Sequence, residues 1–200
     1  MLCLGDSYTI GESVEEKDRF PMQTLELLQK DKVEFSQPTI IARTGWTSTE
    51  LASAIREQNI QQKFDFVTLL AGVNDEYRGL DINDYRKEFR ELLQTAIHYA
   101  DGKPDHVFVL SIPDWGATPF AANDERPRAQ IAKEIDQFNE VNKEEATAAK
   151  VNYIDITPIS RQATSDPSLV AKDGLHPSAK MYTEWAQMLA GSIKKLIHAH

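Results

Sequence analysis

The sequence predicts a single α/β domain built on a parallel sheet, and three observations lead to this prediction. Short apolar runs alternate with helix-length amphipathic segments along the 200 residues, as expected for parallel strands joined by covering helices. No linker, repeat or low-complexity segment divides residues 1–200. A chain of this length buries enough surface to fold without disulfides or metal ions.

The chain opens on a short apolar run, Met1–Leu4, which is consistent with a buried strand. Gly5 follows it directly and allows a sharp exit from the carboxyl end of that strand. A helix is predicted to begin at Phe20–Pro21, because proline is tolerated at the first helical position. Leu25 and Leu28 then lie on one face of this helix.

Two further strands are predicted on either side of a capped helix. Residues 33–42 contain a weak strand, which is clearest over 39–42. Thr47 and Glu50 fit a capping box, in which a hydroxyl and a carboxylate bond to free amides at the start of a helix. Phe64–Ala71 is the clearest buried strand, because it is short, continuous and rich in β-forming residues.

The alternation continues through the second half of the chain. A helix is predicted over residues 84–100, where apolar side chains recur at helical spacing. Strands are predicted over 106–112 and 151–156, on either side of a charged helix over 126–149. The sheet therefore has five predicted strands.

The last forty residues combine an irregular segment with a final helix. Residues 157–175 show no clean periodicity, so we expect a long loop, and loops of this length in a compact domain are often functional. Pro177 suits the first turn of the helix that follows. The apolar face of that helix consists of Met181, Trp185, Met188, Leu189 and Leu196.

Composition narrows the classes of partner. The formal net charge of −9 argues against a nucleic-acid surface, which requires clustered positive charge. No apolar run reaches the roughly 18 residues that span a bilayer, and no basic segment precedes an apolar core at the start. We expect a soluble protein, cytoplasmic as the sequence stands and secreted or periplasmic if a leader has been removed. The sequence does not indicate an oligomeric state.

Cysteine usage and motif spacing give no support for a metal or a cofactor. The single Cys3 cannot form an internal disulfide and is expected to be a small buried apolar residue. No H-E-x-x-H or C-x-x-C spacing occurs, and no G-x-G-x-x-G or Walker sequence follows the first strand. We therefore expect no metal and no cofactor.

Polar motifs follow the predicted strands. Gly5-Asp6-Ser7 follows the first strand, Gly45 the second and Gly72-Val73-Asn74-Asp75 the third, while Asp173–His176 lies beyond the last. Because the carboxyl ends of parallel strands meet at one edge of a sheet, we expect these groups to converge there. Each motif alone is also ordinary turn or cap chemistry. Their order along the chain favours a shared site.

Acyl transfer requires a nucleophile, a base, a group that orients the base, and donors for the oxyanion. Ser7 is the candidate nucleophile. Asp173 and His176 are three residues apart, so a tight turn can bring the carboxylate to one imidazole nitrogen while the other faces the serine. The Gly45 amide and the Asn74 side chain are candidate donors to the oxyanion.

These blocks resemble those of the SGNH, or GDSL, hydrolases of esters, and the resemblance extends over the whole chain. It implies that Ser7 is the nucleophile, that His176 is the general base and that Asp173 orients it. It also implies an oxyanion hole made by the backbone amides of Ser7 and Gly45 and the side chain of Asn74. The implied fold is a flavodoxin-like three-layer α/β/α sandwich with a mostly parallel five-stranded sheet.

Three details refine this interpretation. The second block reads Arg43-Thr44-Gly45-Trp46 in place of the family's small glycine-rich turn, so we expect Trp46 to narrow the site. Asp6, next to the serine, is expected to be a local turn-former because Asp173 lies beside the histidine. The Gly-x-Ser-x-Gly sequence of the α/β-hydrolases is absent.

The leading hypothesis is a serine esterase that acts on small acyl, lipid or acetylated-sugar esters through an acyl-enzyme on Ser7. The alternative is a noncatalytic carbohydrate- or lipid-binding module that uses Trp46, Trp115 and Phe120 as a stacking surface. Trp115 and Phe120 follow the fourth strand and look exposed, and they either line an acyl or sugar site or pack on the neighbouring helix. The family includes carbohydrate deacetylases, lysophospholipases and thioesterases, so the resemblance leaves the ester open.

Overall fold

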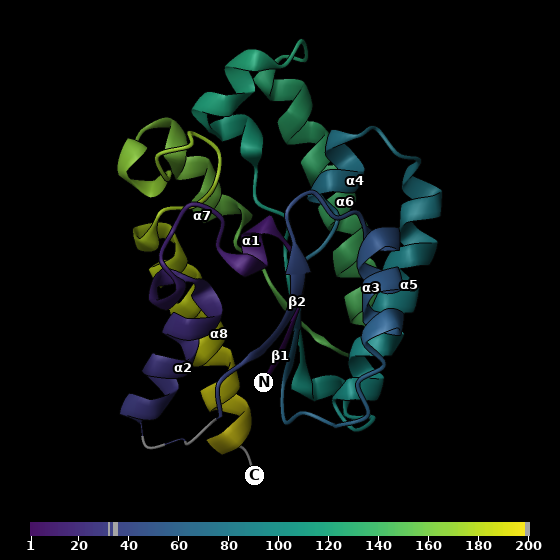
Figure 1. Cartoon of the computed structure of the whole chain (residues 1–200). Coiled ribbons are helices and arrows are strands. Elements are labelled where there is room, and N and C mark those ends of the chain that lie inside the picture. The colour runs from purple at the N-terminus through teal and green to yellow at the C-terminus, as the bar shows by residue number, and fades with distance from the viewer. Residues whose placement is uncertain (32, 34–35, 199–200) are drawn as a thin grey trace.

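Five parallel strands form the centre of the molecule in a computed structural model that describes residues 1–31, 33 and 36–198 (Figure 1). The sheet order is β2-β1-β3-β4-β5, and every neighbouring pair is parallel. This is the strand order of flavodoxin-like doubly wound sheets. The predicted fold class is confirmed. The strands are β1 (Leu2–Asp6), β2 (Thr39–Arg43), β3 (Val67–Leu69), β4 (Val107–Leu110) and β5 (Asn152–Ile154).

Helices cover both faces of the sheet and complete the three-layer sandwich. Helices α2 (Phe20–Lys30) and α8 (Ala179–His198) pack against each other on one face. Helices α3 (Ser48–Gln58), α5 (Ile82–Tyr99) and α6 (Arg128–Ala148) lie together on the other face (Figure 1). None of the helices in the described ranges is long and apolar enough to span a membrane.

Short helical turns follow the strands. Helices α1 (Ser7–Ile10), α4 (Val73–Tyr77) and α7 (Thr157–Arg161) come after β1, β3 and β5. Six 3-10 turns are also described, namely η1 (Glu16–Asp18), η2 (Pro104–His106), η3 (Trp115–Ala117), η4 (Pro119–Asn123), η5 (Gln162–Thr164) and η6 (Pro167–Leu169).

The prediction of a long irregular loop over residues 157–175 is wrong. Helix α7 and the turns η5 and η6 occupy much of this segment. Each has at most five residues. A repeat of 3.6 residues cannot show itself over so short a span, so the sequence carries no periodicity there.

Several strands are shorter than their apolar runs. Only three residues of the run over Phe64–Ala71 belong to β3. The residues on either side of β3 also form backbone hydrogen bonds with β1. The amide of Leu2 donates to the carbonyl oxygen of Phe66 at 2.9 Å, and the amide of Leu70 donates to Leu4 at 3.1 Å. Burial, rather than ladder pairing, therefore sets the length of the apolar run. For the predicted strand over 33–42, residues 34 and 35 lie outside the described part of the chain.

The helix signals are confirmed at α3 and in part at α8. Thr47 and Glu50 form the predicted capping box at the start of α3. Helix α8 begins at Ala179, and Pro177 precedes it, forming a β-bridge with Val170. Met188 was expected on the buried face but is 37% exposed. Its neighbour Gln187 is exposed as well, whereas Leu189 is buried, so Met188 lies outside the buried face of the helix.

Strand β1 is the centre of the core. All five of its residues are buried between β2 and β3, with the two helical layers on either side. Burial raises the pKa of the Cys3 thiol to about 11, so the thiol stays neutral near pH 7. Cys3 is therefore a small buried apolar residue, as the sequence indicated.

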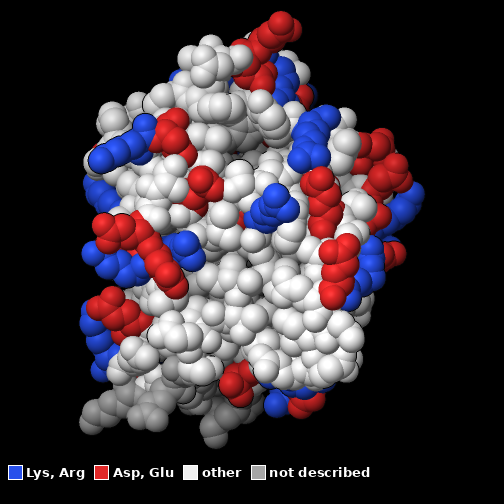
Figure 2. All heavy atoms as spheres, in the orientation of Figure 1, with Lys and Arg blue, Asp and Glu red and all other residues white. Residues whose placement is uncertain are grey.

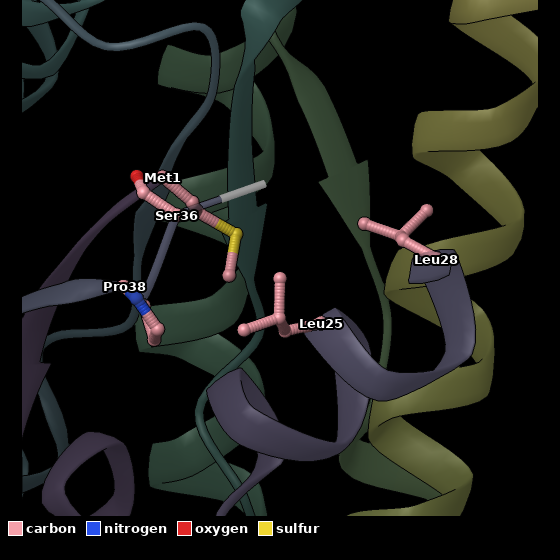
Figure 3. A pocket seen from close by; sticks show the side chains of 5 residues that line it. All are labelled: Met1, Leu25, Leu28, Ser36 and Pro38. Atoms are coloured by element: carbon pink, nitrogen blue, oxygen red, sulfur yellow. The ribbon is translucent and has the colours of Figure 1, made fainter. Parts of the chain in front are cut away.

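A hollow also lies at the amino end of β1, away from the polar motifs. Figure 3 shows its lining, which consists of Met1, Leu25, Leu28, Ser36 and Pro38. These side chains include no ionisable group. The hollow lies at the end of β1 opposite to Ser7, and none of the polar motif residues lines it.

Gly5 is the point where the main chain passes most closely under α1. A Cβ atom at this position would lie 2.1 Å from Oγ1 of Thr9 and 2.7 Å from the carbonyl oxygen of Leu70. The second of these is backbone and cannot swing away. Only glycine therefore fits at this turn from strand to helix.

We predict that Gly5→Ala destabilises the fold by about 1–3 kcal/mol or more, because overpacking forces the backbone to shift. Urea unfolding measures the change. The matched control is Gly191→Ala in the middle of α8, where an added Cβ meets no atom within 4 Å. That control should gain about 0.5–1 kcal/mol from helix propensity. Equal effects of the two substitutions would contradict the close approach at Gly5.

Candidate active site

Ser7 is placed at the carboxyl edge by the turn from β1 into α1. It is the first residue of α1 and is 5% exposed. Oδ1 of Asp6 accepts a hydrogen bond from the amide of Tyr8 at 2.9 Å, so Asp6 caps this short helix. Burial raises the pKa of Asp6 to about 7, against the opposing effect of the bond from Tyr8. The structure therefore places Asp6 as the expected turn-former.

The structure brings Ser7, His176 and Asp173 together from opposite ends of the chain. Nε2 of His176 lies 2.9 Å from Oγ of Ser7. Nδ1 of the same ring lies 2.6 Å from Oδ2 of Asp173. The imidazole thus contacts the hydroxyl on one side and the carboxylate on the other.

The loop that carries the imidazole is held by local hydrogen bonds. Oδ1 of Asp173 accepts from the amides of Leu175 and His176, each at 3.0 Å, which is an Asx-type turn. The amide of Ala171 donates to the carbonyl oxygen of His176 at 2.8 Å. These bonds fix the carboxylate and the ring relative to each other.

Asp173 is held in its charged form. Burial acts to raise its pKa, but hydrogen bonds from Ser13, from the His176 ring and from two backbone amides outweigh burial. The net result is a pKa well below the usual range of an aspartate. A permanent negative charge therefore faces Nδ1 of His176.

Asn74 lies between the segment of Ser7 and the segment of Gly45. Its Nδ2 donates to the carbonyl oxygen of Trp46 at 2.9 Å and lies 3.5 Å from Oδ2 of Asp6. Gly45 has φ +82°, a left-handed conformation that favours glycine. The side-chain amide of Asn74 is thus fixed beside the turn that carries Gly45.

Asp75 joins the two segments that carry the candidate donors. Its Oδ2 accepts from the amide of Ser48 at 3.0 Å and from the Ser48 hydroxyl at 3.1 Å. Ser48 is the first residue of α3, which follows the Gly45 turn. Burial raises the pKa of Asp75, and the bonds from Ser48 oppose this effect.

A pocket with a cavity volume of about 90 Å³ opens beside Ser7. Its polar lining consists of the serine, the Asn74 amide and the His176 imidazole, and the remainder is aromatic or apolar. The full lining is Ser7, Tyr8, Val73, Asn74, Tyr77, Trp115, Phe120, Leu175 and His176. Gly45 and Trp46 are not among these residues, so the structure does not place Trp46 as a wall of this pocket.

The sequence interpretation of Trp115 as an exposed residue is wrong. Trp115 is 2% exposed, although part of it lines the pocket. Tyr77 meets its ring at 5.3 Å and 79°, and Phe120 meets it at 6.1 Å and 69°. Phe120 is half-buried and lines the pocket. The three rings therefore form one packed aromatic cluster.

A buried carboxyl group holds Trp115 in place. Nε1 of Trp115 donates to Oε2 of Glu76 at 2.7 Å, and Nη1 of Arg126 donates to Oε1 of Glu76 at 2.8 Å. The Arg126 guanidinium also lies 5.2 Å from the centre of the Trp115 ring. Burial raises the pKa of Glu76 to about 7, against the bonds from Trp115 and Arg126. The indole is thereby fixed by its nitrogen and by one face.

Sequence reasoning missed several residues of the site. Tyr8, Val73 and Leu175 each adjoin a motif residue, so their positions beside Ser7, Asn74 and His176 were a usable signal. Tyr77, 47% exposed, lies one helical turn after Asn74. Ser13, whose hydroxyl reaches Asp173, gave no signal because serine is common in polar turns.

Charged side chains of both signs are mixed on the surface. Figure 2 shows Lys and Arg interspersed with Asp and Glu on one face, without a large patch of one sign. Within residues 1–31, 33 and 36–198, no group of three or more His, Cys, Asp or Glu side chains is placed to hold a metal ion.

Comparisons with known proteins agree on family and fold. The family model for GDSL-like lipases and acylhydrolases matches residues 3–183. Among solved structures, TesA is 16% identical, with 98% of each chain covered and a TM-score of 0.74. A lipase/acylhydrolase from Enterococcus faecalis is 22% identical, with 97% of this chain and 94% of that chain covered and a TM-score of 0.74. No curated protein matches the chain.

An acetylxylan esterase from Geobacillus stearothermophilus also shares the fold. It is 19% identical, with 96% of this chain and 92% of that chain covered and a TM-score of 0.72. At these identities the likeness to solved structures is one of fold.

The raised pKa of Asp6 gives a prediction for stability against pH. Its pKa rises from 3.8 to about 7 on folding, so its contribution to stability is fully present below about pH 4 and is lost as pH rises towards 7. The side chain of the Asp6→Asn variant stays neutral. The stability of this variant relative to the wild type should therefore increase as pH rises from 4 to 7. The gain has a slope of at most about 1.4 kcal/mol per pH unit.

Urea unfolding at several pH values measures this slope. Asp166→Asn is a control of opposite sign, because hydrogen bonds from Lys180 and Ser168 lower the pKa of Asp166 to about 2. The difference in stability between Asp166→Asn and the wild type should shrink as pH falls below about 4. It should stay constant between pH 4 and 7. A difference between wild type and Asp6→Asn that does not vary with pH would contradict the burial argument.

Proposed function

The chain belongs to the GDSL-like lipase/acylhydrolase family, and from this premise we propose that it is a serine esterase acting through an acyl-enzyme on Ser7. The observation that carries the proposal is the continuous contact from Asp173 through His176 to Ser7, at 2.6 Å and 2.9 Å. Charged Asp173 keeps a proton on Nδ1 of His176, which leaves Nε2 free to accept from the hydroxyl.

The proposed reaction has two steps. Oγ of Ser7 attacks the ester carbonyl carbon while Nε2 of His176 takes the hydroxyl proton, and the same nitrogen then gives that proton to the departing alcohol. In the second step His176 removes a proton from water, and the resulting hydroxide attacks the acyl carbon. Collapse of this intermediate releases the carboxylic acid and returns the proton to Ser7.

The oxyanion of each intermediate requires donors, and we assign them to the backbone amides of Ser7 and Gly45 and to Asn74. The bond from Nδ2 of Asn74 to Trp46 fixes the side-chain amide and uses one of its two hydrogens. The second hydrogen has only the long contact of 3.5 Å with Oδ2 of Asp6, and it is the one we assign to the oxyanion. A prearranged donor of this kind typically contributes about 10²–10³ in rate.

The pocket favours a small acyl group. Its cavity volume of about 90 Å³ lies below the usual range for ligand sites, about 300–1,000 Å³, and its walls are aromatic and apolar. The similar solved structures include a lipase/acylhydrolase and an acetylxylan esterase. We therefore propose short-chain esters as substrates, with a lipid or an acetylated sugar as the alcohol part.

The noncatalytic alternative receives less support from the side chains. A stacking surface requires open ring faces, but Trp115 is buried, with Arg126 over its ring and with Tyr77 and Phe120 in edge-to-face contact with it. Trp46 does not line the pocket. The predicted surface of Trp46, Trp115 and Phe120 is therefore not a continuous one.

Ser7→Ala should lower the turnover of a p-nitrophenyl ester by about 10⁴-fold or more, because the acyl-enzyme cannot form. A fluorophosphonate probe should label the wild type and not this variant, and circular dichroism should show the fold retained. Ser165→Ala, at an exposed serine that does not line the pocket, is the matched control. An active Ser7→Ala variant, or a wild type that resists the probe, would favour the noncatalytic module.

Phe120→Ala tests the proposed acyl side of the pocket. Removing this half-buried ring lengthens the space beside Ser7, so we expect the preference for acetyl over hexanoyl p-nitrophenyl ester to fall by roughly tenfold, the value of one or two methylenes in an apolar pocket. Met188→Ala, at an exposed apolar residue on α8, should leave the ratio unchanged. A change in kcat without a change in this ratio would place the acyl chain elsewhere.

A further inference from the structure

Among the residues that the structure describes, one from outside the loop of Asp173 donates a hydrogen bond to its carboxylate. The amides of Leu175 and His176 and the His176 ring come from within three residues of it. The remaining donor is the hydroxyl of Ser13, which lies 160 residues away in the sequence and 2.6 Å from Oδ2 of Asp173. Ser13 therefore ties the loop of Asp173 to the opposite end of the chain.

Ser13 lies on the turn that closes α1, the helix that begins with Ser7. The amide of Glu12 donates to the carbonyl oxygen of Ser7 at 3.0 Å, and the amide of Val14 donates to Gly11 at 3.3 Å. These bonds fix the turn relative to the nucleophile. The three loop bonds orient Asp173 within its own loop, whereas the Ser13 bond orients it relative to Ser7.

The backbone of Ser13 adopts a conformation that serine disfavours. Its φ is +67°, in the left-handed region, where a residue with a side chain is strained. Glycine would avoid this cost. Strain of this kind is retained where the surrounding contacts require it and is frequent at functional sites. The side-chain contact described for Ser13 is the bond to Asp173.

We propose that Ser13 is a positioning residue, whose hydroxyl holds the Asp173 carboxylate, and through it the His176 imidazole, in line with Ser7. This inference rests on the proposed esterase function. Ser13 does not touch the reacting atoms, and it acts through Asp173.

The hydroxyl has an electrostatic effect as well as a geometric one. Ser13 and Nδ1 of His176 bond to the same oxygen, Oδ2 of Asp173. The hydroxyl therefore shares the negative charge that the imidazole faces. Without it, the full charge of Oδ2 faces the ring, so we expect the acid limb of the pH–rate profile of kcat/KM to move upward.

Other ionisable groups surround this pair. Tyr8 of α1 lies with its ring 5.3 Å from the imidazole, and burial raises its pKa and that of Tyr182 on α8 far above neutrality, so both are neutral. The negative charges of Asp6, Asp114 and Glu76 also raise the pKa of Tyr8. These groups are the same in wild type and Ser13 variants, so their titration cancels in the comparison.

Two substitutions separate the hydroxyl from the strain. Ser13→Gly removes the hydroxyl and suits the left-handed backbone, so its thermal unfolding midpoint should equal or exceed that of the wild type. Ser13→Thr keeps a hydroxyl but is β-branched, so its midpoint should fall. The control is Lys150→Gly, because Lys150 is exposed and left-handed, with φ +60°, on the turn between α6 and β5.

The test measures kcat/KM for p-nitrophenyl acetate from pH 5 to 9, together with the rate of fluorophosphonate labelling. For Ser13→Gly we expect the plateau to fall by roughly threefold to tenfold, a modest loss because water can reach this exposed position and replace part of the bond. Its acid limb should shift upward by a few tenths of a pH unit. For Ser13→Thr and Lys150→Gly, the acid limb of the kcat/KM profile should stay at the wild-type pH.

The outcomes distinguish this inference from the proposed function. A Ser13→Gly variant with the wild-type plateau and acid limb would overturn the positioning role while leaving the esterase intact. Equal losses in Ser13→Gly and Ser13→Thr would also overturn it, because the hydroxyl would not be the cause. A wild type with neither turnover nor labelling would overturn both.

Discussion

The parallel pairing of β1 with β2 and β3 is the constraint on which the site depends. Asp6 pairs with Arg43 of β2, and Leu4 pairs with Leu69 of β3. The chain leaves all three strands at the same edge, where the residues that follow are Ser7, the Gly45 turn and Asn74. A shift of register would separate these groups, and the buried sequence of β1 opposes such a shift because it would break the packing of both faces.

The loop that carries His176 is held at this edge of the sheet by the packing of α8. Helix α8 packs on α2, and the hydroxyl of Tyr182 donates to the carbonyl oxygen of Tyr8 at 2.9 Å. Trp185 lies fully buried one turn later. The loop of His176 is therefore anchored to α1 through the core, and the hydroxyl of Ser13 adds a second connection near the surface.

The sequence singled out Ser7, Asn74, Asp173 and His176 by their side-chain chemistry and motif spacing, and their proposed catalytic roles remain predictions. It could not predict Glu76, because the role of that carboxyl depends on an indole and a guanidinium from other elements. The same contacts explain why Trp115 was wrongly expected to be exposed. Tertiary partners decide the burial of a loop aromatic, and local sequence does not record them.

The carboxyl groups at this edge of the sheet differ in the number of hydrogen bonds that each accepts. Asp6 is 1% exposed and accepts one strong bond, from Tyr8, so burial prevails and its pKa rises. Asp173 has a side chain 29% exposed and accepts four hydrogen bonds, so its pKa falls. Near neutral pH, Asp173 is thus the better stabiliser of a positive imidazole. Asp6, although adjacent to the serine, is suited to capping, and this division follows from solvation and donor number rather than from proximity in sequence.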